Sequence, residues 1–188
     1  MSSMRPVNRN ALLREARLAH VPPPVLPVLE SNNSELRQAL ERLQAAPTTA
    51  NYLDVAEAYV HERVPDRAHD YLTKSLAVNG PDAAVYDSLA RLWRDWGQPG
   101  EGLGHAHRSV YLAPLSPVAH NTLGTVLYRL HRTADARASF TRALELDPKA
   151  WYALANLCHL SMAAGDTRAA ISQCRQAAVL RKAASSTD

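Results

Sequence analysis

Eight histidines and two cysteines are the side chains of this sequence best suited to catalysis or metal binding. His105 and His107 are two residues apart on an expected helix, so their side chains face different ways. His159 lies in a partly apolar helical pattern, where a histidine with no ligand or general-base role is the favoured interpretation. No cysteine or histidine pair stands near Cys158 or Cys174 at the spacing of zinc ligands. The sequence therefore predicts no catalytic residue, no metal site and no cofactor.

Motifs of the common enzyme classes are also missing from the sequence. There is no phosphate-binding glycine loop, no GxSxG, no HExxH and no paired-carboxylate motif. The net charge of +3 falls short of the basic stripe of a nucleic-acid-binding protein. No segment approaches the roughly 18 apolar residues of a membrane span, and the N-terminus lacks the apolar core of a signal peptide. We expect a non-enzymatic, cytoplasmic protein that binds no nucleic acid and does not insert into membranes.

A period of 34 residues organises the chain and positions these side chains. Pro114 and Pro148 are 34 residues apart, and each follows a helical pattern that ends in an aliphatic run. Large, apolar and small residues keep their places through four copies; examples are Val55, Leu89, Leu123 and Leu157, and Ala68, Gly102, Ala136 and Ala170. Each copy carries two apolar stripes at helical spacing, which predicts a pair of packed helices.

The third copy resembles the tetratricopeptide repeat (TPR) most closely. It keeps the family's L-G, A, F, A and P residues as Leu123, Gly124, Ala136, Phe140, Ala143 and Pro148. His120 and Leu127 replace the family's opening aromatic residue and its tyrosine. The resemblance covers about residues 49–182 and implies an all-α solenoid of four helix-turn-helix repeats. The expected repeats are 49–82, 83–116, 117–150 and 151–182, with helices near 50–62, 66–78, 83–96, 101–112, 117–130, 134–146, 151–163 and 167–181.

The segments outside the four copies predict an extension at each end. Residues 1–33 predict a partly disordered arm with a proline-rich connector at 22–27. Within 34–48 an amphipathic helix begins at the N-cap Ser34 and covers the first repeat. The amphipathic residues 10–19 dock either on a partner or on the solenoid, and both interpretations stay open. Residues 183–188 predict a disordered tail.

Cysteines and glycines give two further expectations. Cys158 and Cys174 fall on the two helices of one repeat at core-facing places, which favours two buried thiols over a disulfide. Two cysteines cannot form a disulfide framework, so we also expect a reducing compartment. Gly100, Gly102 and Gly104 lie in or beside the second helix of the second copy, which we expect to be the least stable helix of the array.

The TPR resemblance implies that the first helices of the copies line a concave binding groove. Asn121 and Asn156 could hydrogen-bond the backbone of an extended peptide, since an amide donates and accepts; that asparagine is simply common at such sites is the open alternative. The two-cation clamp by which some TPR co-chaperones bind a terminal carboxylate has no counterpart here. On the family's geometry the groove side chains are Asp54, Glu57, Asp87, Arg91, Arg94, Asn121, Thr125, Arg129, Tyr152, Asn156 and His159, together with Leu53, His61, Ser88 and Thr122.

A second candidate surface lies on the last expected helix. Ile171, Ala178 and Val179 are apolar, and only a short polar segment follows them. This face docks another protein or another copy of the chain, or remains uncovered as an alanine-rich helix can; these interpretations stay open.

The function expected from the sequence is that of an adaptor or scaffold that binds a peptide segment or a protein surface. A secretion or assembly chaperone is the alternative within the same class. An RNA-binding helical repeat is less favoured, because the expected groove carries charges of both signs.

Overall fold

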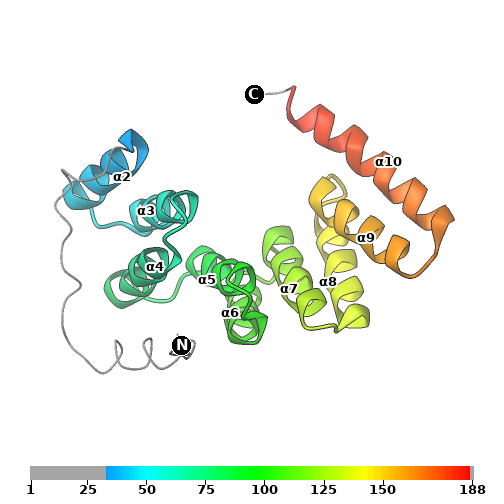
Figure 1. Ribbon diagram of the computed structural model, residues 1–188, viewed down its shortest axis with the longest axis horizontal. Helices are drawn as coiled ribbons and strands as arrows, with labels where there is room; N and C mark the ends of the chain where they lie inside the picture. Colours follow the sequence, from blue (N-terminus) through cyan, green and yellow to red (C-terminus); the bar gives the residue numbers. More distant parts are fainter. Residues whose placement is uncertain (1–32, 187–188) are drawn as a thin grey trace, which may run out of the picture. The chain divides into compact units, whose positions relative to one another are not determined.

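The computed structural model describes residues 33–186. This part of the chain contains nine α-helices and no strand, so the expected all-α fold is confirmed for it (Figure 1). The predicted arm with its proline-rich connector, and the two interpretations of residues 10–19, lie outside the described residues. The helices are α2 (Ser34–Ala45), α3 (Thr49–His61), α4 (Pro65–Asn79), α5 (Ala83–Asp95), α6 (Pro99–Leu112), α7 (Pro117–Arg129), α8 (Thr133–Leu146), α9 (Trp151–Ala163) and α10 (Thr167–Ala184).

The ends of the array differ from the sequence-based expectation in two details. Asn33, not Ser34, is the N-cap of α2: its side-chain oxygen accepts hydrogen bonds from the backbone N–H groups of Glu35 and Leu36. At the other end α10 continues to Ala184, into the segment expected to be a disordered tail. Alanine is the best helix former, and the cations Arg181 and Lys182 in the last turn interact favourably with the helix dipole.

Packing follows the order of the helices along the chain. The pairs α3–α4, α5–α6, α7–α8 and α9–α10 each form a helical hairpin, and α2 packs on α3 (Figure 1). The first helix of each hairpin also contacts the first helix of the next, through α3–α5, α5–α7 and α7–α9. Apolar side chains that are almost fully buried, including Val55, Leu72, Leu89, Phe140 and Leu160, fill the space between these layers. This stacking brings the four first helices together on one face.

Gly124 allows the two helices of the third repeat to approach closely. A Cβ atom at this position would lie 2.5 Å from Cε1 of Phe140, which is far inside van der Waals contact. With the Phe140 ring in this position, the α7–α8 crossing leaves no room for a side chain at residue 124.

The glycines of α6 occupy two different environments. A Cβ atom on Gly102 would lie 2.9 Å from the backbone oxygen of Ala90 and 3.3 Å from Cβ of Trp93, whereas one on Gly104 would meet nothing within 4 Å. We expect Gly104→Ala to stabilise the protein by about 1 kcal/mol, because alanine has the higher helix propensity. Gly102→Ala should destabilise it, since backbone must move. Urea denaturation of both variants tests this contrast, and shifts of the midpoint in the same direction would contradict it.

Cys158 and Cys174 form a disulfide bond between α9 and α10, with their Cα atoms 5.3 Å apart. The expectation of two free thiols is therefore wrong, because the helix crossing brings both residues within the distance range of a disulfide. The expectation that both are buried is also wrong: Cys158 is fully buried, but Cys174 is exposed. Phe140 is the residue equivalent to Cys174 in the third repeat, and the following repeat covers it. Cys174 has no such cover, because within residues 33–186 no helix follows α10.

Candidate functional site

A contact between neighbouring first helices recurs along the array. The Nδ2 group of Asn156 on α9 donates a hydrogen bond of 2.8 Å to Oδ1 of Asn121 on α7, and the two residues are 35 positions apart. The same spacing joins Asp87 on α5 to Thr122 on α7, whose hydroxyl donates to the carboxylate. These side chains hold the first helices in register.

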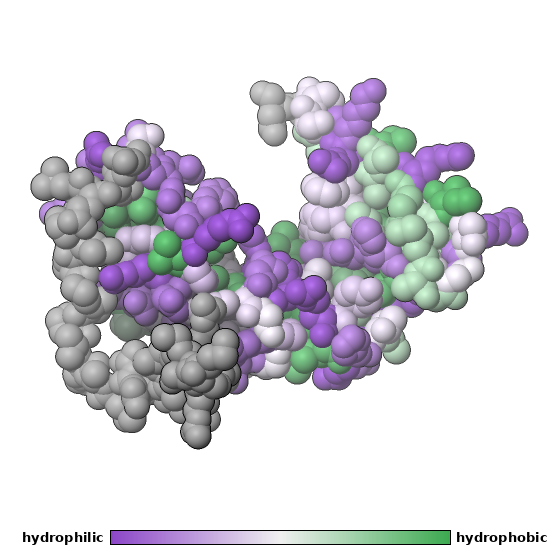
Figure 2. Space-filling view, in the orientation of Figure 1, coloured by the Kyte–Doolittle hydropathy of each residue, from purple (hydrophilic) through white to green (hydrophobic). Residues whose placement is uncertain are grey.

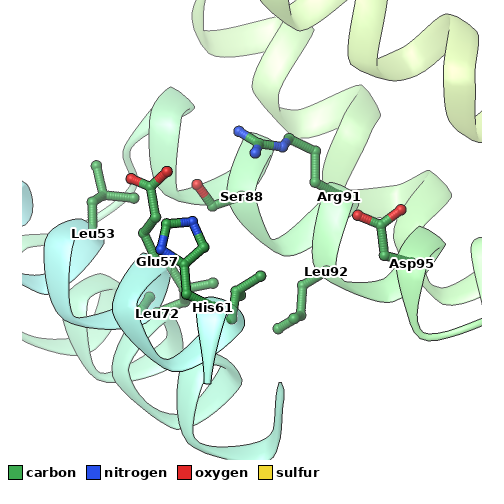
Figure 3. A pocket seen from close by; sticks show the side chains of 10 residues that line it. Leu53, Glu57, His61, Leu72, Ser88, Arg91, Leu92 and Asp95 are labelled. Atoms are coloured by element: carbon green, nitrogen blue, oxygen red, sulfur yellow. The ribbon is translucent and has the colours of Figure 1, made fainter. Parts of the chain in front are cut away.

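A first pocket opens between α3 and α5, with a volume of about 270 Å³ (Figure 3). Glu57 and His61 project from α3, opposite Arg91 and Asp95 on α5. Among the described residues Glu57 makes no ion pair, and Arg91 lies 3.9 Å from the buried Asp87 carboxylate. The pocket thus combines an apolar lining with a rim of both charges. Its lining is completed by Leu53, Ala56, Val60, Leu72, Ser88 and Leu92.

A second pocket, of about 370 Å³, is formed by α5, α7 and α9. Arg94 is fixed there by two hydrogen bonds to the Asp95 carboxylate, at 2.7 and 2.9 Å, and a third of 2.8 Å from Nη1 to the Thr125 hydroxyl. Arg129 makes no ion pair within residues 33–186, and His159 is exposed beside it in the lining. The second pocket thus contains one guanidinium group, that of Arg129, with which no carboxylate of residues 33–186 pairs. Its remaining lining residues are Tyr128, Phe140, Asn156 and Leu160.

The two pockets occupy equivalent places two repeats apart along the array. Glu57 and Arg91 line the first pocket, Thr125 and His159 line the second, and these four residues follow one another at the repeat spacing. Asp95 lines both pockets, and its ion pair with Arg94 lies where they meet. We call this side of α3, α5, α7 and α9 the groove face.

Asp87 lies beneath the groove face rather than on it. It is only 7% exposed, and its Oδ1 atom has no hydrogen-bond partner among the described residues. Burial raises the pKa of the Asp87 carboxyl, while the Thr122 hydrogen bond and the charges of Arg91 and Arg94 oppose that rise. Asp87 thus joins α5 to α7 and is not accessible to a ligand.

Several other predicted groove residues also lie outside both pockets. Asp54 forms an ion pair of 3.2 Å with Arg42, which directs it toward α2. Asn121 is the hydrogen-bond partner of Asn156, and Tyr152 packs edge-on against Trp151. The predicted residues that do line a pocket are Leu53, Glu57, His61, Ser88, Arg91, Arg94, Thr125, Arg129, Asn156 and His159.

Three exposed members of the pockets were not among the predicted groove residues. Val60, Asp95 and Tyr128 follow Glu57, Arg91 and Thr125 by three or four positions, so helical periodicity places them on the same face. The apolar residues between the helices, such as Leu72 and Phe140, carry no such signal, because they also serve as core.

The described residues hold neither a cluster of metal ligands nor a membrane span. No three His, Cys, Asp or Glu side chains of residues 33–186 gather in a way that could hold a metal ion. None of the helices in this range is sufficiently long and apolar to cross a membrane.

Comparison with known proteins identifies the repeat. The family model described as "Tetratricopeptide repeat" matches residues 117–150, which span α7 and α8. The chain folds as a TPR protein. A search of the curated proteins finds no match to this sequence.

Solved structures show the same TPR fold at low sequence identity. MamA 41-end from Desulfovibrio magneticus RS-1 is 16% identical, covering 93% of each chain, with a TM-score of 0.64. The APC/C hetero-tetramer Cut9–Hcn1 contains a chain that is 22% identical, over 77% of this chain and 29% of that one, with a TM-score of 0.70. The human IFIT1 dimer with PPP-AAAA is 18% identical, over 78% of this chain and 36% of that one, with a TM-score of 0.66. Likeness at this level establishes the fold alone.

Proposed function

We propose that this TPR protein is a non-catalytic interaction scaffold whose groove face binds an extended peptide segment of a partner protein. The Asn121–Asn156 pair carries the proposal. Within the described residues, their mutual hydrogen bond leaves the amide nitrogen of Asn121 and the side-chain oxygen of Asn156 unused. A free donor and a free acceptor on two bonded side chains can pair with the N–H and C=O groups of a peptide backbone.

The two pockets of the groove face indicate which peptide side chains would be accepted. The first pocket has mainly aliphatic walls and suits an apolar side chain. The second pocket suits an acidic side chain, because Arg129 and the exposed His159 face it without an ion-pair partner in residues 33–186. A short segment that holds both an apolar residue and an Asp or Glu is thus the preferred ligand pattern.

RNA binding has less support for this chain, although the human IFIT1 structure holds PPP-AAAA. Glu57 and Asp95 stand in the same groove face as the cations, and they would repel a phosphate backbone. A secretion or assembly chaperone would also bind peptide segments. Co-purification with an export substrate would distinguish such a chaperone from a scaffold.

A library of random 12-residue peptides tests the proposal. Selection on the full chain should enrich peptides that hold both an apolar residue and an acidic residue. For a selected peptide, Asn121→Ala together with Asn156→Ala should weaken binding about 5- to 150-fold, because two hydrogen bonds of about 0.5–1.5 kcal/mol each are lost. Arg129→Glu should remove the preference for acidic residues.

Matched variants control for non-specific effects. Asn79→Ala changes an exposed asparagine at the end of α4, and Lys149→Glu reverses an exposed charge between α8 and α9. Both should bind the selected peptide as the unmodified chain does, and circular dichroism should show that all variants are folded. Undiminished binding by the double asparagine variant and by Arg129→Glu would refute the groove as the peptide site.

A further inference from the structure

One side of α10 is equivalent to a surface that the next repeat covers in each of the three preceding repeats. In the first repeat His69 and Leu72 of α4 lie against α5, with the His69 ring 5.4 Å from that of Trp93. In the second repeat Leu103 and Val110 of α6 are partly buried against the core shared with the third repeat. In each case the first helix of the next repeat supplies the cover.

The equivalent residues of α10 are exposed. Ile171 stands 34 positions after Arg137, and it is 57% exposed. Cys174 and Ala178 follow it by three and seven positions, so all three share one side of the helix, and both are exposed. We call this side, with the neighbouring Arg175, the end face. The end face is in the position of a helix-binding surface, because a helix covers the equivalent surfaces of α4 and α6.

The charge of α10 is entirely of one sign. Between Thr167 and Ala184 the helix carries Arg168, Arg175, Arg181 and Lys182 and no acidic residue. Within the described part of the chain none of these four cations forms an ion pair, although Arg181 lies over the Trp151 ring at 5.6 Å. Figure 2 shows green hydrophobic side chains beside purple hydrophilic ones in the region of α10. The end face is therefore apolar at its centre and cationic along its margins.

We propose that the end face binds an acidic amphipathic helix of a partner protein, in the place that the first helix of a further repeat would take. Apolar side chains of this helix would cover Ile171 and Ala178, and its carboxylates would pair with Arg168 and Arg175. The proposal does not depend on peptide binding at the groove face.

Charge argues against the two occupants that this chain itself could supply. A symmetric contact between two copies of α10 would bring eight cations together without a compensating carboxylate. Residues 1–32 contain four arginines and two glutamates, so this segment is itself basic. The favoured occupant is thus an acidic segment of another protein.

Two labelled synthetic peptides test the proposal with the oxidised full chain. Both form an 18-residue helix with leucine and alanine at i, i+3, i+4 and i+7; one carries glutamate beside this stripe and the other carries lysine. Fluorescence anisotropy should show at least about tenfold tighter binding of the glutamate peptide, and added salt should weaken it. Equal affinity for the two peptides, or no binding of the glutamate peptide, would overturn the proposal.

Variants locate the binding to the end face. Ile171→Glu and Arg175→Glu should each weaken binding of the glutamate peptide about tenfold or more, whereas Ile171→Leu and the distant Lys149→Glu should leave it unchanged. Circular dichroism should show that Ile171→Glu remains folded, since Ile171 is exposed. Binding that Ile171→Glu and Arg175→Glu both leave intact would overturn the proposal.

Two further measurements examine the rival occupants. The chain should not dimerise at micromolar concentration, and it should not bind vesicles of phosphatidylcholine and phosphatidylserine. Dimerisation that Ile171→Glu abolishes would assign the end face to a second copy instead. Vesicle binding that Ile171→Glu abolishes would assign it to an anionic membrane surface, and either result would refute the acidic helix.

Discussion

Reduction of the Cys158–Cys174 disulfide is expected to lower the free energy of unfolding by about 3 kcal/mol. The bond joins residues 16 positions apart, and a cross-link of this span removes about that much chain entropy from the unfolded state. Cys174→Ser should have the same effect without reductant. Cys174 is the residue to replace, because it is exposed whereas Cys158 is fully buried.

Urea denaturation with and without dithiothreitol measures the effect, and the Cys174→Ser variant is its control. The reductant should shift the midpoint of the unmodified chain and leave that of Cys174→Ser unchanged. Because each repeat contacts only its neighbours, hydrogen exchange should accelerate mainly in α9 and α10. Two free thiols in the native oxidised protein, or equal midpoints with and without reductant, would contradict this prediction.

Phe140→Ala is expected to cost about 3–5 kcal/mol of stability. Phe140 is the only phenylalanine of the chain and is 2% exposed, between α7 and α8. Its ring packs against Gly124, so truncation leaves a cavity at the closest approach of the two helices. Gly124→Leu should cost about 1–3 kcal/mol for the opposite reason, because the added side chain meets the ring.

The double variant Gly124→Leu/Phe140→Ala provides a sharper test than either single change. Leucine at position 124 can occupy the space that the ring vacates, so the combined loss should be smaller than the sum of the two single losses. Chemical denaturation of the four proteins of this cycle measures the coupling. Strict additivity would show that the two side chains do not share one space, against the close approach seen in the structure.

The groove face illustrates what helical periodicity can predict. The 34-residue spacing placed Glu57, Arg91, Thr125 and His159 at equivalent sites, and the structure brings them to the linings of two pockets. Steps of three or four residues would have added Val60, Asp95 and Tyr128. Periodicity could not show which groove side chains already form hydrogen bonds within the protein. Arg94, for example, donates hydrogen bonds to Asp95 and Thr125.

The sequence by itself determined the helical pairs, their order and the small residue at position 124, because these depend on local propensity and on a repeated pattern of side-chain size. Only the tertiary structure decided the burial, the bonding partners and the oxidation state of Asp87, Asn156 and Cys174. Asp87 is buried, Asn156 is bonded to Asn121, and Cys174 is oxidised yet exposed. Each depends on a neighbour 16 to 35 positions away along the chain, or on the absence of a covering helix after α10 within residues 33–186. The angle and distance at which helices cross determine such contacts, and a pattern of residue types along one helix does not specify either.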